Sequence, residues 1–136
     1  MRDRMAALAL ERLATSKRKL REAVGRRTLA PVEIEQESRR IGDTVLALPE
    51  FREANHVGLY LSMPNEPATD MLVLACHDLG RTVYVPASLS GDSGYAMARV
   101  ERDTLLAPGR FGVREPVNPA WAEPGDIDLM ILPGVA

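Results

Sequence analysis

Cysteine, aromatic residues and long apolar runs are all scarce in this 136-residue sequence. No apolar run reaches the roughly 20 residues that a membrane-spanning helix needs. The single cysteine, Cys76, excludes an internal disulfide framework and indicates a reducing compartment, for which we expect the cytoplasm. Two Phe, three Tyr and one Trp leave few rings on which nucleic-acid bases could stack.

Charge is unevenly distributed, although the formal net charge is only −2. Residues 1–29 contain nine Lys or Arg and three Asp or Glu, a net charge of +6, so the remainder carries −8. This asymmetry predicts that the N-terminal segment binds an anion or lies against the acidic remainder. Since no aromatic residue interleaves with the basic cluster, we expect no nucleic-acid partner. The lack of a long apolar run likewise leads us to expect no membrane partner.

The first twelve residues, MRDRMAALALER, contain arginines and are mildly amphipathic. A mitochondrial presequence is usually poor in acids and rich in serine, so Asp3 and Glu11 argue against one. The segment is then the start of a long helix, with mitochondrial targeting as the open alternative.

Metal-ligating residues are also few. His77 has no Cys or acidic partner at metal-binding spacing, and His56 merely precedes a strand, so we predict no metal-binding residue. Asp126 and Asp128 are interpreted as a turn before a strand, with a magnesium role as the alternative. Cys76 lies on an apolar helix stripe and is predicted to be a small buried hydrophobic residue.

Hydrophobic periodicity and turn residues predict helices over residues 3–28, 31–48 and 69–79, and strands over 57–62, 81–86, 95–100 and 128–132. Pro31 suits a first helical position, Pro49 ends or kinks the second helix, and Gly80 is a left-handed stop for the third. The apolar strand 57–62 is typical of a parallel sheet covered on both faces. The strand–helix–strand unit should be parallel and right-handed, which predicts an α/β protein. The last strand has no following helix, so we expect a sheet that is incomplete at the C-terminus.

Two groups of side chains are candidates for ligand binding. Glu66 ends the loop after strand 57–62, and ligands of open α/β sheets bind at the carboxyl ends of strands. Lys17 and Arg21 are four residues apart on one helix face, where they could neutralise a polyphosphate. The alternatives are an exposed loop acid and a solvated basic surface.

Three blocks, in the same order and spacing, resemble the 5-formyltetrahydrofolate cyclo-ligase family over residues 16–136. KRKLR at 17–21 resembles the family's K-x-x-L-R helix, and LSMPNE at 61–66 its L-S-M-x-x-E strand end. The third block, PGRFGV at 108–113 with DIDLMILPG at 126–134, is similar to G-x-F/W-G-I/V followed by D-L, three apolar residues and P-G.

The resemblance implies a Rossmann-like, three-layer α/β fold with a mainly parallel sheet. It implies ATP- and magnesium-dependent cyclisation of 5-formyltetrahydrofolate to 5,10-methenyltetrahydrofolate, with release of ADP and phosphate. The implied partners are therefore a folate and ATP. The implied ATP-binding residues are Lys17, Arg18, Lys19, Leu20 and Arg21, although Leu20 by itself is better interpreted as core packing. No catalytic residue is assigned.

The implied folate-binding residues come from two loops. Glu66 would accept hydrogen bonds from the pterin, and Leu61 and Met63 would form an apolar wall for its ring, with strand-end core as their alternative. Phe111 would stack on the ligand or pack in the core. Ala87 and Ser88 stand where the family often has a basic or polar residue, which weakens any contact from that loop.

The family's glycine-rich motif, expected soon after Gly134, does not occur before the sequence ends at Ala136. We therefore expect residues 1–16 to be a helical N-terminal extension and 17–136 the N-terminal part of one cyclo-ligase-like domain. The alternative function is that of a non-catalytic, truncated member that binds folate or a partner protein.

Overall fold

The computed structural model describes residues 2–25, 29–91 and 94–133. The chain divides into two units, residues 1–29 with 134–136 and residues 30–133, and each is described by itself. The first unit contains α1 (Arg2–Gly25). The helix was predicted over residues 3–28, of which 26–28 lie outside the described residues.

Two helices open the second unit, α2 (Pro31–Ala47) and α3 (Pro49–Glu53). Each begins with proline at its first turn, where the missing N–H would have no intrahelical partner. Pro49 therefore ends one helix, as the sequence predicted, and also starts the next, which was not predicted. The side chain of Glu33 adds to the start of α2 by accepting the N–H of Ala30 at 3.3 Å.

The predicted strand–helix–strand unit is present as β1 (His56–Leu59), α4 (Asp70–Asp78) and β2 (Thr82–Ser88). The two strands are parallel, with Val57 opposite Val83. Gly80 has φ +70° and ends α4 as expected, because only glycine adopts this conformation without cost. β1 is shorter than the predicted 57–62.

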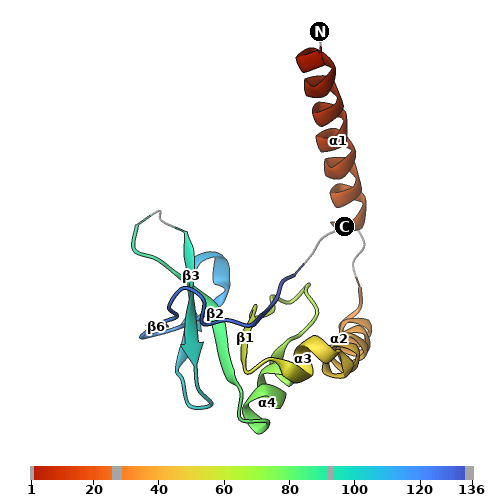
Figure 1. Ribbon diagram of the computed structural model, residues 1–136. Helices are drawn as coiled ribbons and strands as arrows, with labels where there is room; N and C mark the ends of the chain where they lie inside the picture. Colours follow the sequence, from red (N-terminus) through yellow and green to blue (C-terminus); the bar gives the residue numbers. More distant parts are fainter. Residues whose placement is uncertain (1, 26–28, 92–93, 134–136) are drawn as a thin grey trace. The chain divides into compact units, whose positions relative to one another are not determined.

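The main sheet has five strands in the order β6–β3–β2–β1–β7 (Figure 1). β3 (Tyr95–Val100), β6 (Ala120–Trp121) and β7 (Leu129–Ile131) complete it. β1 runs parallel to both β2 and β7, whereas β3 is antiparallel to both of its neighbours. β6 therefore points in the same direction as β2, and only β3 runs against the other four. The predicted α/β class with a mainly parallel sheet is confirmed.

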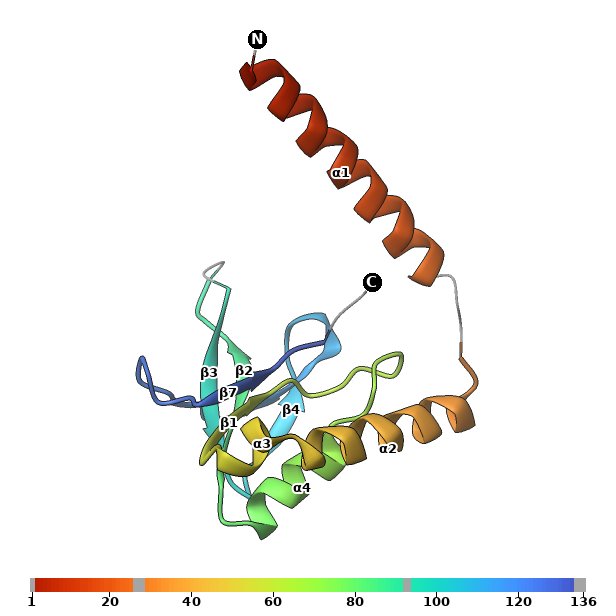
Figure 2. The ribbon, with the colours of Figure 1, turned by 45° about the vertical axis from the view of Figure 1, so that its right-hand side comes forward.

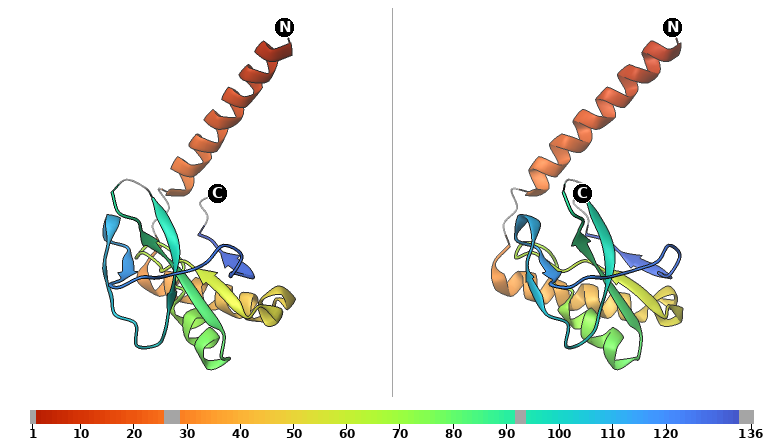
Figure 3. Two further views of the ribbon diagram at one scale, coloured as in Figure 1. Left: turned by 60° about the vertical axis from the view of Figure 1, so that its left-hand side comes forward. Right: turned by 90° about the vertical axis from the view of Figure 1, so that its left-hand side faces the viewer.

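A small second sheet pairs β4 (Leu106–Pro108) with β5 (Arg114–Pro116) around the turn η1 (Arg110–Gly112). It lies beside β2, as the two views in Figure 3 show in blue. The sequence predicted no strand between residues 100 and 128, because strands of three residues are too short to show alternation.

The core lies between the sheet and the helices α2, α3 and α4, which share one face of the sheet (Figure 2). Phe51 of α3 and Leu72 and Cys76 of α4 pack on alternate residues of β1 and β2, namely Val57, Leu59, Val83 and Val85. Cys76 is fully buried, as predicted, and burial raises the pKa of its thiol, while Arg81 opposes this weakly.

Candidate functional site

The carboxyl ends of β1 and β2 lie at the same edge of the sheet, because the two strands are adjacent and parallel. The segment 60–69, which contains Glu66, leaves β1 at this edge (Figure 2). Ser88 ends β2 there and is hydrogen-bonded to Glu115 of the β4–β5 hairpin. Two segments far apart in the sequence thus flank the edge where α/β proteins bind ligands.

Hydrogen bonds fix the segment 60–69 along its length. The hydroxyl of Tyr60 donates to the carbonyl of Pro67 at 2.9 Å, and the hydroxyl of Thr69 donates to the carbonyl of Tyr60 at 2.7 Å. The N–H of Ala68 donates to the hydroxyl of Ser38 on α2 at 2.8 Å. The segment is therefore tied both to itself and to a helix.

Glu66 is half-buried inside this fixed segment. Its Oε2 accepts the N–H of Met63 at 3.0 Å, and its own N–H donates to the carbonyl of Met63 at the same distance. A carboxylate has about four acceptor positions, so this bond leaves most of its capacity for a ligand. Burial, followed by the charge of Glu66, raises the pKa of Tyr60.

The structure separates the two predicted wall residues. Met63 is 38% exposed in the Glu66 turn, whereas Leu61 is 6% exposed and belongs to the core cluster. The folate role of Leu61 stays a prediction, and core packing was its alternative interpretation.

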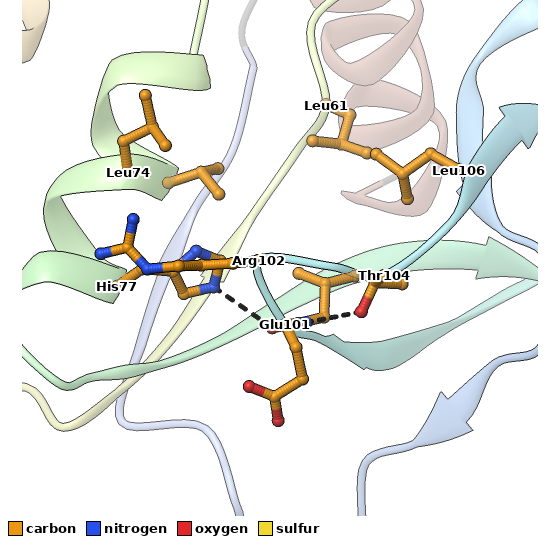
Figure 4. Close-up of a pocket in the computed structure, with 9 residues that line it drawn as sticks. Leu61, Leu74, His77, Glu101, Arg102, Thr104 and Leu106 are labelled. Atoms are coloured by element: carbon orange, nitrogen blue, oxygen red, sulfur yellow. Dashed lines mark hydrogen bonds between the residues drawn. The ribbon is translucent and has the colours of Figure 1, made fainter.

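Leu61 also lines a groove of about 330 Å³ between α4 and the segment after β3 (Figure 4). Leu74 and Leu106 form its apolar walls, and His77 lies within it with Nε2 3.3 Å from the carbonyl oxygen of Val100. A shallower hollow of about 510 Å³ lies next to it, around Arg81 and Arg99. Neither is lined by Glu66, Met63 or Phe111. The candidate site at the carboxyl edge therefore lies outside both hollows.

Phe111 lies at the centre of η1 and is 80% exposed, which excludes the core packing that was the alternative to ligand stacking. Its backbone has φ 59° and ψ 20°, and it is the one non-glycine residue with positive φ among the described residues. A large apolar ring is thus presented to solvent by a left-handed turn.

Glu115, on β5, was not predicted from the sequence to be a site residue. It is 8% exposed and accepts hydrogen bonds from the N–H and the hydroxyl of Ser88 and from the N–H of Arg110. Burial raises the pKa of Glu115, but the bonds from Ser88 and Arg110 and the Arg110 charge together hold it below its ordinary value. Nothing local in the sequence marks Glu115, since Ser88 lies 27 residues away.

The basic residues predicted to bind ATP, Lys17, Arg18, Lys19 and Arg21, are all exposed on α1. Leu20 was expected to pack in a core, and this expectation is wrong because its side chain is 52% exposed. Leu8 and Leu13 of α1 are also about half exposed. α1 runs unbroken through the proposed boundary between residues 16 and 17, which stays a prediction.

No cluster of three His, Cys, Asp or Glu side chains suited to a metal ion occurs in the part of the chain that the structure describes. Asp126 closes a turn by accepting the N–H of Glu123 at 2.8 Å. Asp128 accepts the N–H groups of Asn55 and His56, each at 3.0 Å, and these bonds lower its pKa. The predicted turn before the last strand is present, and Asp128 joins it to the start of β1.

The family model of the 5-formyltetrahydrofolate cyclo-ligase family matches residues 12–136. The chain belongs to this family. It is 27% identical over 112 residues to a probable 5-formyltetrahydrofolate cyclo-ligase of Caenorhabditis elegans, and 28% identical over 107 residues to one of Schizosaccharomyces pombe. Each match covers 76% of this chain, and the chain spans only about half of each relative, 54% and 52% respectively.

The NMR structure of Aquifex aeolicus 5,10-methenyltetrahydrofolate synthetase has the same fold, with a TM-score of 0.70 and 30% sequence identity. The match covers 88% of this chain and 61% of that one. Across the described residues, no helix is both long and apolar enough to cross a membrane.

Proposed function

We propose that the protein takes part in the ATP-dependent cyclisation of 5-formyltetrahydrofolate to 5,10-methenyltetrahydrofolate. The observation that carries the proposal is Glu66, a half-buried carboxylate fixed at the carboxyl edge of β1 with acceptor capacity to spare. A pterin presents an amino group and a ring N–H side by side, and a carboxylate binds such a pair with charge-assisted hydrogen bonds. The relatives named as cyclo-ligases and as a methenyltetrahydrofolate synthetase support this choice of ligand.

The apolar contacts would come from two exposed side chains. Met63 lies in the turn whose backbone Glu66 holds, and its thioether adapts to a flat ring. Phe111 offers the face of its ring from η1, and an aromatic face stacks on another ring system with an offset. Leu61 would not contact the ring but would support the end of β1 from within the core.

The nucleotide would be held by α1. Lys17 and Arg21 project from one face and Arg18 lies next to Arg21, so several cations meet the phosphates, with arginine able to bind them bidentately. The described residues provide no three-ligand magnesium site, so the ion would arrive with the phosphates of ATP, and we assign no step to it.

The chemistry divides into two displacements. The formyl oxygen attacks the γ-phosphorus of ATP, and ADP leaves. The second folate nitrogen then attacks the formyl carbon and loses its proton, and the C–O bond breaks to release inorganic phosphate with the former formyl oxygen. The protein's contribution would be to position each ligand and to neutralise the phosphate charge.

The test combines turnover with two selective variants. ATP-dependent formation of the methenyl product is followed by its absorbance, and each ligand is titrated separately by calorimetry. Glu66→Gln should weaken the binding of 5-formyltetrahydrofolate by roughly tenfold or more, because one charge-assisted pair is worth about 1.5–3 kcal/mol. The affinity for ATP should stay unchanged. Lys17→Ala with Arg21→Ala should do the reverse.

Arg4→Ala with Arg12→Ala is the matched control, since it removes the same charge from exposed positions of the same helix. Equal effects of the two α1 pairs on ATP would remove Lys17 and Arg21 from the site. Absence of folate binding by the wild-type chain would overturn the proposal, and folate binding without turnover would support the non-catalytic alternative.

A further inference from the structure

Phe111 combines two features that each cost free energy. An L-residue in the left-handed region is strained by roughly 1–2 kcal/mol, and a phenylalanine ring that is 80% exposed gains little from burial. Neither feature persists unless neighbouring groups impose the turn. The contacts that hold η1 therefore decide where the ring points.

Glu115 provides the strongest of these contacts. Its Oε2 accepts the N–H of Arg110, the residue before Phe111, at 3.0 Å, and the hydroxyl of Ser88 at 2.9 Å. Its Oε1 accepts the N–H of Ser88. One buried carboxylate thus joins the start of η1 to the end of β2.

The backbone around η1 is shaped to admit this carboxylate. A Cβ on Gly109 would overlap the Glu115 side chain, so only glycine leaves the room it occupies. The turn is closed by Gly109 N–H donating to the carbonyl of Val113 at 2.7 Å, and the guanidinium of Arg110 donates to the carbonyl of Gly91 at 2.6 Å. These bonds fix the ends of the turn, whereas Glu115 fixes it against the main sheet.

We propose that Glu115 is a positioning residue that anchors η1 to the end of β2 and thereby holds Phe111 left-handed, with its ring presented to the folate. The inference rests on the proposed function only for the identity of the ligand. Both carboxylate oxygens of Glu115 accept hydrogen bonds from Ser88 or Arg110, so Glu115 itself would not contact the substrate.

The first measurement needs no ligand. The NOE between the amide proton and Hα of Phe111 is strong only for a left-handed backbone, so it reports the turn directly. Glu115→Gln keeps the shape of the side chain but turns one acceptor into a donor that faces an N–H group. This NOE should weaken in Glu115→Gln, weaken less in Ser88→Ala, and stay unchanged in Glu123→Gln, which alters an exposed glutamate in the same way.

The second measurement is the affinity for 5-formyltetrahydrofolate by calorimetry, in a double-mutant cycle with Phe111→Ala. Glu115→Gln should weaken binding about tenfold in the wild-type background and have no further effect once Phe111 is alanine. A general loss of structure would instead lower affinity in both backgrounds.

Each outcome decides one part. An unchanged NOE in Glu115→Gln overturns the positioning role. A lost NOE with unchanged folate affinity shows that the conformation of Phe111 is irrelevant to binding and also overturns the proposal. If the wild-type chain binds no folate, the proposed function fails, while the NOE still decides whether Glu115 sets the turn. Should Glu115→Gln fail to fold, Ser88→Ala provides the same two readouts with one bond removed.

Discussion

Glu66 and Glu115 lie at the same edge of the sheet, yet their surroundings differ. Glu66 is half-buried and accepts one N–H, from its own turn, whereas Glu115 is 8% exposed and accepts three donors from two other segments. A buried carboxylate must have its acceptors satisfied, or it would not remain charged there. The comparison separates a carboxylate that builds the site from one that is left available to a ligand.

The largest expected effect is on stability. Glu115→Ala should lower the free energy of unfolding by roughly 2–3 kcal/mol, since it leaves the N–H groups of Ser88 and Arg110 without their acceptor. Glu66→Ala should change it by less than about 0.5 kcal/mol, because water can replace a single bond in an exposed turn. Urea unfolding of both variants checks this, and equal losses would mean that Glu66 is also structural.

A second prediction concerns the support of the Glu66 segment. Ser38→Ala should cost about 1 kcal/mol and speed amide hydrogen exchange at Ala68, whose N–H loses its acceptor. Thr44→Ala is the matched control, because the hydroxyls of Ser38 and Thr44 each donate to the carbonyl four residues before them on α2, and Thr44 lies on the exposed face. Equal exchange in both variants would show that Ser38 does not hold the segment.

The pH dependence of stability gives a smaller effect that belongs to Glu115. Because its pKa in the folded state lies below its ordinary value of 4.5, its contribution is fully present above pH 4.5 and is lost as the pH falls through the folded pKa. The difference in unfolding free energy between wild type and Glu115→Gln should thus be constant near neutral pH and shrink in acid. Urea unfolding at several pH values measures it, and a difference that grew in acid would contradict the assignment.

The smallest expected effect is an increase in stability. Phe111→Asn should raise the free energy of unfolding by about 0.5 kcal/mol, because asparagine tolerates the left-handed region better and little burial is lost. Leu105→Asn, which removes an equally exposed apolar side chain without positive φ, should have no such effect. If Phe111→Asn were destabilising, the ring would make a contact that the turn geometry does not explain.

Local patterns in the sequence were sufficient for most of the elements. The start of α2 at Pro31, its end before Pro49, the stop at Gly80 and the strand–helix–strand unit were all predicted, since each depends on neighbouring residues alone. The short strands β4, β5 and β6 were missed because two or three residues show no period.

The inward face of α2 contains more than its apolar residues. Val45 and Leu46 are partly buried against the core, whereas the fully buried residues of the helix are Ser38 and Gly42. The hydroxyl of Ser38 accepts the N–H of Ala68, and the end of the Met71 side chain lies against Gly42. Both contacts depend on partners outside the helix, which a hydrophobic pattern does not contain.

The sequence by itself determined the family blocks and placed Glu66 after a strand of an α/β sheet, because motif order and strand-end position are properties of the chain. Only the tertiary structure showed that Leu61 is core, that Phe111 is exposed in a left-handed turn, and that Glu115 joins β2 to that turn. These facts arise from contacts between residues distant in the sequence, such as Ser88 and Glu115, which are 27 positions apart. Burial and hydrogen-bond satisfaction over such distances are decided by packing, which no local pattern encodes.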